Sequence, residues 1–276
     1  MLSQLSLKRI SVSVIYLVVG LIFITPLLWM LSTSFKFENQ VFEHPFTFVH
    51  WGHLNFANYK TILLETPFLT WFWNSIFVVF CSVILRLILS VFGGYAFGFL
   101  KFKYSGAIFF LFLMTLFVPY QLTLLPQFIV YRYMGLLDTR WALIIPNIID
   151  ILSIFMMRQF YMSFPRELIS AAYMEGCGVF RSFVKVGLPL AKTPLITLGL
   201  LSFFMIWDQY YQPLIFLKSK ELFTIPIGLQ SFQTQFGKAY AQQMALACLA
   251  IIPVLTVFLA LQKQFIESVV SSGIKG

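Results

Sequence analysis

Residues 66–100 read TPFLTWFWNSIFVVFCSVILRLILSVFGGYAFGFL, and Arg86 is the single charged residue among them. The hydrocarbon core of a bilayer is about 30 Å thick, which a helix of about 20 apolar residues crosses. The stretch lacks the alternation of apolar and polar residues that marks a barrel strand, and a helix is the other way to satisfy a backbone in lipid. The sequence therefore predicts a transmembrane helix here.

Further stretches of this kind lie on both sides of it. We expect spans at about 10–35, 74–100, 106–131, 141–160, 193–217 and 239–262. The fold class is then an all-α integral membrane protein with six transmembrane helices. Composition agrees, since 11% of the residues are charged, against about 25% in soluble domains. A hydrophobic content of 59% excludes a disordered chain, and an odd number of cysteines argues against a disulfide-stapled secreted fold.

Basic residues are distributed unevenly between the two sides of the predicted helices. With the N-terminus inside, the inner side holds eleven of the nineteen Lys and Arg residues and the outer side holds seven. Cytoplasmic loops carry such an excess, so we expect both termini in the cytoplasm. The first stretch is longer than the apolar part of a signal peptide and is expected to remain as a span. The net charge of +9 follows from topology, and no nucleic-acid partner is expected.

One inner connection, residues 163–192, is long enough to hold a helix of its own between spans four and five. Pro165 suits a first helical turn, Glu167 lies where a negative charge favours the helix N-terminus, and Gly176 or Gly178 can end the helix in a left-handed conformation. A short helix over 165–176 is predicted. Ala171 and Ala172 give it a small-residue face that a partner could approach closely. The alternative is an amphipathic helix that lies on lipid headgroups.

This connection resembles the cytoplasmic EAA loop of the permease subunits of binding-protein-dependent ABC importers. The matching residues are PRELISAAYMEGC at 165–177, Phe183, Leu188-Pro189-Leu190 and Pro194. Other matches point to the carbohydrate branch and its second, maltose-type permease with a type I fold: Asn58-Tyr59, Asn74-Ser75, Gly94-Tyr95-Ala96, Pro119, Trp207, TIPIGL at 224–229 and GIKG at 273–276. Ser170, Glu175 and Asp208 depart from the residues usual in the family, which are Glu, Asp and Asn.

The resemblance implies one ABC transmembrane domain over 1–276, in the bacterial inner membrane, that carries a sugar, expected to be an oligosaccharide. It implies a second homologous permease, an ATP-binding cassette ATPase dimer with ATP and Mg, an extracellular solute-binding protein and membrane lipid as partners. It also assigns ATPase coupling to Ser170, Ala171, Ala172, Glu175, Gly176, Leu188 and Pro189, and a tail contact to Gly273, Lys275 and Gly276.

ATP hydrolysis is not expected on this chain. The G-x-x-x-x-G-K-[ST] loop that holds nucleotide phosphates is absent, because Gly237-Lys238 has Phe232 in place of the first glycine. The chain is therefore predicted to be a transporter subunit without a cofactor. The alternative is a self-sufficient ion-coupled transporter; a membrane enzyme is disfavoured because no catalytic cluster is evident.

Three predicted spans contain a charged residue, at a cost of about 2.5–3.5 kcal/mol each. Each charge has polar companions at helical spacing, so these residues should face protein or water. Aromatic faces stack on sugar rings, and carboxylates accept hydroxyl hydrogens. We therefore predict a substrate path lined by Asp208, Trp207, Tyr210, Tyr211, Arg86 and Asp150. The alternative is that Arg86 pairs with one of the aspartates to hold helices together. His44, His50 and His53 are taken as ordinary loop residues, and no metal is expected.

Overall fold

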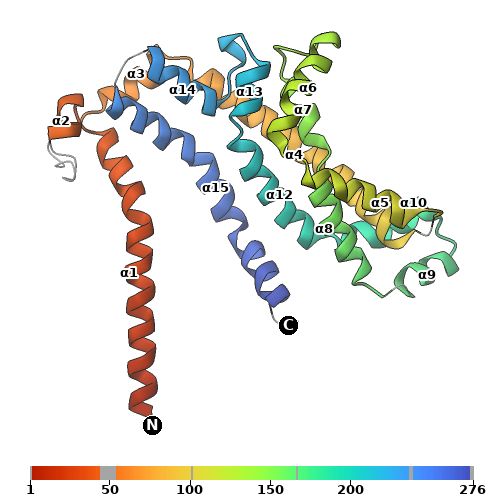
Figure 1. The fold of residues 1–276 in the computed structure, drawn as a ribbon. Coiled ribbons are helices and arrows are strands. Elements are labelled where there is room, and N and C mark those ends of the chain that lie inside the picture. Colours follow the sequence, from red (N-terminus) through yellow and green to blue (C-terminus); the bar gives the residue numbers. More distant parts are fainter. Residues whose placement is uncertain (1, 44–53, 101, 166, 236–238, 274–276) are drawn as a thin grey trace. The chain divides into compact units, whose positions relative to one another are not determined.

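The computed structural model describes residues 2–43, 54–100, 102–165, 167–235 and 239–273. Figure 1 shows the helices of the chain with their labels. The chain divides into two compact units. The first unit contains residues 1–69 and 228–252, and the second contains residues 70–227 and 253–276.

The first unit holds the N-terminal helices and the start of the last helix. Its elements are α1 (Leu2–Ser34), α2 (Glu38–Glu43), α3 (Ala57–Glu65), most of α14 (Ile225–Gln235) and the first part of α15 (Tyr240–Gly273). The last carbonyl groups of a helix have no partner within it. Asn58 supplies one, because its Nδ2 donates to the backbone oxygens of Ser34 (2.8 Å) and Lys36 (2.9 Å). The Asn58-Tyr59 motif thus fixes the end of α1.

The second unit holds the remaining helices. They are α4 (Phe68–Phe99), α5 (Ser105–Met114), α6 (Tyr120–Tyr133), α7 (Trp141–Ile148), α8 (Ile151–Met162), α9 (Glu167–Met174), α10 (Val179–Ser182), a π-helical turn (Phe183–Gly187), α11 (Leu188–Leu190), α12 (Lys192–Trp207), α13 (Tyr211–Phe216) and the rest of α15, with 3₁₀ turns at Thr115–Phe117 and Lys220–Leu222.

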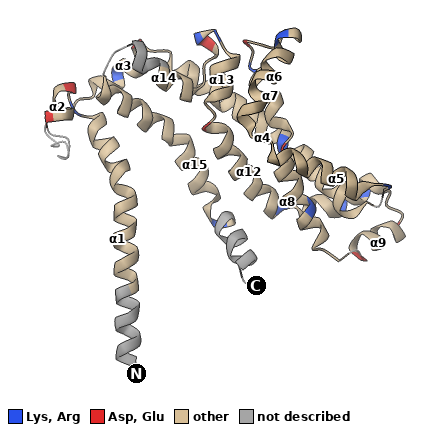
Figure 2. Cartoon of the chain, viewed as in Figure 1, with Lys and Arg blue, Asp and Glu red and all other residues tan. Residues whose placement is uncertain are grey.

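Within the described residues, four segments are long and apolar enough to cross a membrane. They are Val12–Ser34, Phe68–Phe99, Trp141–Met162 and Tyr240–Gln264. Two bent helix pairs, Ser105–Phe117 with Tyr120–Tyr133 and Val179–Leu190 with Lys192–Trp207, raise the number to six if each pair is one span. Figure 2 shows long helical stretches free of charged residues. An all-helical membrane protein is thereby confirmed.

The predicted spans differ from the observed helices where the chain breaks. The stretch expected at 106–131 is bent by 100° between Phe117 and Tyr120. Val118 there is extended (ψ 114°), as the residue before a proline tends to be, and Pro119 precedes α6. The stretch expected at 193–217 ends its first helix at Trp207 and resumes at Tyr211. The stretch expected at 141–160 is interrupted at Ile149 and Asp150.

The helices α4 and α8 cross at close range. A Cβ atom built on Gly94 would lie 2.4 Å from the Cβ of Met157, and one on Gly98 would lie 2.9 Å from the Cβ of Tyr161. Small residues four apart let two membrane helices approach in this way. Residues at this crossing belong to a buried apolar cluster, which consists of Val91, Tyr95, Met157, Tyr161, Ile169, Phe183, Ala191 and Leu198. This cluster joins the bundle to the inner loop.

Candidate functional site

The predicted inner helix is present as α9, Glu167–Met174, inside the expected range. Gly176 follows it with φ +78°, while Gly178 is extended. The N–H of Gly176 donates to Tyr173 O (3.0 Å), and the N–H of Cys177 donates to Ala172 O (2.9 Å). This pair of bonds is the Schellman motif, which satisfies the last carbonyls of a helix and needs a left-handed residue. Of the two glycines proposed as the stop, Gly176 is the one used.

The two alanines of α9 lie on different faces. Ala172 and Ile169, three residues apart, are each 6% exposed, and Ile169 belongs to the buried cluster, whereas Ala171 and Ser170 are exposed. The expectation that Ala172 contributes to a surface for a partner is therefore wrong, because its side chain packs inside its own chain. The other coupling candidates, Glu175, Gly176, Leu188 and Pro189, are exposed.

Two tyrosines tie the loop after α9 to the transmembrane helices. The hydroxyl groups of Tyr95 on α4 and Ser182 are 2.7 Å apart and share a hydrogen bond. The hydroxyl of Tyr161 on α8 donates to Gly187 O (3.1 Å). A Cβ on Gly187 would lie 2.8 Å from the Tyr95 ring. Both bonds are buried, so they hold this loop against α4 and α8.

Arg86 and Asp150 meet at the break between α7 and α8. Arg86 Nη1 lies 3.9 Å from Asp150 Oδ2, and Arg86 Nε donates to Asn147 O (2.8 Å) at the end of α7. Asp150 caps α8, accepting from the backbone N–H of Ser153 (3.1 Å) and from its hydroxyl. The polar companions expected for Asp150 at helical spacing are Asn147 and Ser153, and they do not share one helix with it, because Asp150 stands between α7 and α8. The alternative in which Arg86 pairs with an aspartate describes this geometry.

Asn147 also joins this break to the one that follows α12. Its Nδ2 donates to Gln209 Oε1 (2.8 Å), and Gln209 Nε2 donates to Asn147 Oδ1 (2.8 Å). Asn147 Nδ2 further contacts Gln212 Oε1 (3.2 Å) and Leu143 O (2.8 Å). Asn147 and Gln212 are 3% and 1% exposed. Sequence reasoning missed Gln209; its signal was an amide next to a charged residue in an apolar stretch.

The predicted aromatic face around Asp208 is divided by the same break. The helix α12 ends at Trp207, with Asp208 as its C-cap, so Asp208, Tyr211 and Gln212 do not share a continuous helical face as expected. Trp207 is buried, Tyr210 is half-buried, and Asp208 and Tyr211 are exposed. Within the described part of the chain, the Asp208 carboxylate makes no hydrogen bond or ion pair, so it is not joined to Arg86.

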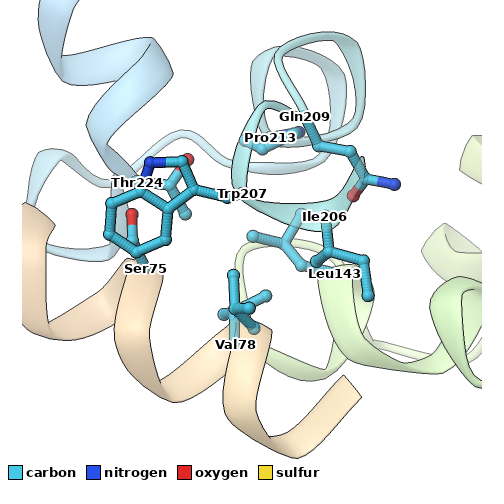
Figure 3. Close-up of a pocket in the computed structure, with 9 residues that line it drawn as sticks. Ser75, Val78, Leu143, Ile206, Trp207, Gln209, Pro213 and Thr224 are labelled. Atoms are coloured by element: carbon cyan, nitrogen blue, oxygen red, sulfur yellow. The ribbon is translucent and has the colours of Figure 1, made fainter. Parts of the chain in front are cut away.

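A small cavity of about 10 Å³ lies beside this break, with room for about one water molecule. It is lined by Ser75, Val78, Val79, Leu143, Ile206, Trp207, Gln209, Pro213 and Thr224. In Figure 3 the indole of Trp207 lies near Ser75 and Thr224, while Gln209 extends in another direction. The hydroxyl of Thr224 is buried without a hydrogen-bond partner among the described residues. A sugar does not fit this cavity.

Three polar side chains hold the connection between α6 and α7 and the connection between α13 and α14. Asn74 Nδ2 donates to the backbone oxygens of Glu221 (2.7 Å) and Phe223 (3.0 Å), and Ser75 Oγ accepts from Ile225 N–H (2.8 Å). The Asn74-Ser75 motif thus anchors the start of the TIPIGL motif. Asp138 (φ +58°) accepts from the Ser219 hydroxyl and from the N–H groups of Ser219 and Lys218, and these bonds lower the pKa of its carboxyl.

The remaining predicted positions carry less information. Gly273 is the last residue of α15, whereas Lys275 and Gly276 lie outside the described residues. The three histidines, His44, His50 and His53, also lie outside them. Among the described residues, no cluster of three His, Cys, Asp or Glu side chains that could hold a metal ion occurs.

Comparison with known proteins gives matches along the whole chain. It is 31% identical over 276 residues to the arabinooligosaccharides transport system permease protein AraQ of Bacillus subtilis, covering 99% of this chain and 98% of that one. It is 32% identical over 254 residues to the sulfoquinovosyl glycerol transport system permease protein SmoH of Agrobacterium fabrum, covering 91% and 88%.

Among solved structures, the fold matches a chain of a bacterial ABC transporter involved in the import of the acidic polysaccharide alginate. The TM-score is 0.82 at 24% identity, and the match covers 94% of this chain and 97% of the other. No protein-family model matches the chain.

Proposed function

The chain belongs to the permease subunits of binding-protein-dependent sugar ABC importers, and we propose that it forms, with a second permease, the membrane path for an oligosaccharide. It is a multi-pass protein of the bacterial inner membrane and is not itself the ATPase. The observation that carries the proposal is full-length similarity to a permease named for arabinooligosaccharides. Other relatives are named for lactose and diacetylchitobiose, which supports an oligosaccharide over a single sugar.

Reconstitution tests whether this chain needs a partner ATPase for transport. The chain assembled with a second permease, an ATPase dimer and a solute-binding protein should take up sugar when ATP is supplied. Omission of the ATPase should abolish uptake, because the energy has to enter through a partner. Uptake by this chain alone, driven by an ion gradient, would instead support the self-sufficient transporter.

Coupling to the ATPase is proposed for the exposed face of α9 and the turn after it. This face carries Ser170, Ala171, Glu175 and Gly176, and Leu188 and Pro189 lie exposed further along the loop. Three things support it: the resemblance of the loop, the exposure of these residues, and the buried tyrosine bonds that link the loop to α4 and α8. Ser170 stands where the family usually has Glu, so we propose that Glu175 supplies the charged contact instead.

A bulky residue at Gly176 tests this docking surface. Nothing lies within 4 Å of a Cβ built there, so Gly176→Trp adds volume that only a partner would meet. It should leave insertion intact and uncouple ATP hydrolysis from uptake. Because φ is +78°, Gly176→Asn serves as the control for backbone strain, since Asn tolerates this conformation. Gly106→Trp, also in open space, controls for bulk alone. Normal transport by Gly176→Trp would count against docking at this turn.

The substrate path is proposed to pass the break after α12, at Asp208, Tyr210 and Tyr211, with Trp207 behind them. The support is an exposed carboxylate without a partner among the described residues, beside aromatic rings. Arg86 and Asp150 are proposed to shape the path through the neighbouring break. Asp208→Asn should assemble normally and change transport rate or sugar preference. Unchanged rate and preference in that variant would exclude Asp208 from the path.

A further inference from the structure

Two helix breaks of the second unit, the one after α7 and the one after α12, are joined by a pair of carboxamides. Asn147 is the next-to-last residue of α7, and Gln209 lies between α12 and α13. Two reciprocal bonds of 2.8 Å connect them. Two parallel hydrogen bonds between planar groups fix orientation as well as distance, and in low dielectric they are stronger than in water.

The asparagine is itself held from several sides. Its backbone oxygen accepts from Arg86 Nε (2.8 Å), its Oδ1 accepts from Arg86 Nη2 (3.2 Å), and its Nδ2 donates to Leu143 O (2.8 Å). With 3% of its surface exposed, Asn147 cannot turn without breaking buried bonds. It therefore presents a fixed amide to Gln209.

The consequence for Asp208 follows from its two neighbours. Trp207 is buried, with its ring near Ser75 and Thr224, and Gln209 is bonded to Asn147 (Figure 3). A residue whose neighbours on both sides are anchored has little freedom of its own backbone. The backbone of Asp208 is thus fixed, and its exposed side chain leaves the break from a set position, without a hydrogen bond or ion pair to the described residues.

We propose that Asn147 is a positioning residue of the translocation path, which acts through Gln209 to aim the Asp208 carboxylate at the passing sugar. This rests on the path proposed above. Arg86 is a positioning residue too, because its guanidinium fixes Asn147. Arg86 does not need to contact the sugar. The Asn147–Gln209 amide pair orients Asp208, and Asp208 contacts the sugar.

The test uses a water-soluble thiol reagent, so it does not depend on which sugar is carried. The starting transporter has Cys81, Cys177 and Cys248 replaced by Ser, carries Asp208→Cys, and is assembled with its partner subunits. Its reaction rate with methanethiosulfonate ethyltrimethylammonium is measured in membranes. Adding Gln209→Met removes both reciprocal bonds without touching Arg86. It should change the rate about tenfold, as expected when one or two neutral hydrogen bonds no longer select an orientation.

Two further variants separate positioning from general stability. Ser153→Ala removes the hydroxyl bond to Asp150 at the neighbouring break and should leave the rate unchanged. The double exchange Asn147→Gln with Gln209→Asn keeps both amides and the total number of methylenes, and should restore the rate. Co-purification of the partner subunits confirms assembly of each variant.

The outcomes distinguish the two proposals. A reactive thiol whose rate is the same with and without Gln209→Met overturns the positioning role and leaves the path intact. An equal change caused by Ser153→Ala also overturns it, because the effect is then general loosening. A thiol that reacts in no nucleotide state overturns the path at Asp208 and the positioning role with it.

Discussion

Replacement of Gly94 by alanine tests whether the crossing of α4 and α8 is as close as the structure has it. The new Cβ would lie 2.4 Å from Met157 Cβ and 2.8 Å from Met157 C, whereas ordinary contacts begin at 3.4 Å. The helices must therefore separate by roughly 1 Å, and the obstacle includes backbone that no rotamer change removes. Overpacking of this kind costs about 1–3 kcal/mol. Because α8 runs on toward the inner loop, coupling should weaken together with stability.

The assay is the thermal midpoint of the assembled, detergent-solubilised transporter, measured beside ATP-driven uptake. Gly20→Ala in α1 is the matched control, since nothing lies within 4 Å of its added Cβ. Alanine there gains about 1 kcal/mol of helix propensity and should be neutral or stabilising. Gly94→Ala should lower the midpoint and the uptake per ATP hydrolysed. A midpoint equal to that of Gly20→Ala would refute the close crossing.

Three other substitutions test polar contacts. Arg86→Met should reduce co-purification with the partner subunits, because Asn147 O loses its donor and Asp150 loses a nearby cation. Asp208→Asn should leave co-purification unchanged. Equal losses in the two variants would contradict this geometry. Asp138→Asn should lower the thermal midpoint at neutral pH. In the folded protein, the pKa of the Asp138 carboxyl lies below its usual 3.8. The difference in thermal midpoint between the variant and the parent should therefore disappear as pH falls through that folded value. A difference that persists at lower pH would count against these hydrogen bonds. Glu38→Ala should lower the free energy of unfolding by about 1 kcal/mol, because both carboxylate oxygens of Glu38 accept from the first N–H groups of α15 (2.7 and 2.9 Å). Unchanged hydrogen exchange at the N–H groups of Tyr240 and Ala241 would exclude this cap.

Hydropathy predicted the membrane class, and the residues at the helix ends predicted the inner helix, because both signals are local in the sequence. Stretch 66–100 is mostly apolar, with Arg86 as its single charged residue, and Gly176 supplies a stop signal that needs no tertiary contact. The breaks were harder to predict. Pro119 was visible, but a proline in an apolar stretch is compatible with a kinked helix or with a bend of 100°. Asp150 fits helical spacing equally well as an interior residue or as a cap.

The site was predicted in part for the same reason. Asp208 and Trp207 stand out as a charge and a large aromatic residue in an apolar run, whereas Gln209 and Asn147 become informative only once their helices are known to end beside each other. The sequence alone does not distinguish the buried Ala172 from the exposed Ala171. Only the packing of Ile169 against Tyr95, Tyr161 and Phe183 in one cluster decides which of the two alanines faces inward.

The charges within the apolar stretches follow one electrostatic rule at the break between α7 and α8. The C-terminus of α7 carries partial negative charge and receives the Arg86 guanidinium, while the N-terminus of α8 carries partial positive charge and receives the Asp150 carboxylate. Both ions are therefore accounted for by the helix ends they satisfy. Asp208 stands differently, since it caps the C-terminal end of α12, where a negative charge is unfavourable. Because this carboxylate has no hydrogen bond or ion pair among the described residues, its oxygens can accept hydroxyl hydrogens from a sugar, which favours the proposed role in transport over one in holding the helices together.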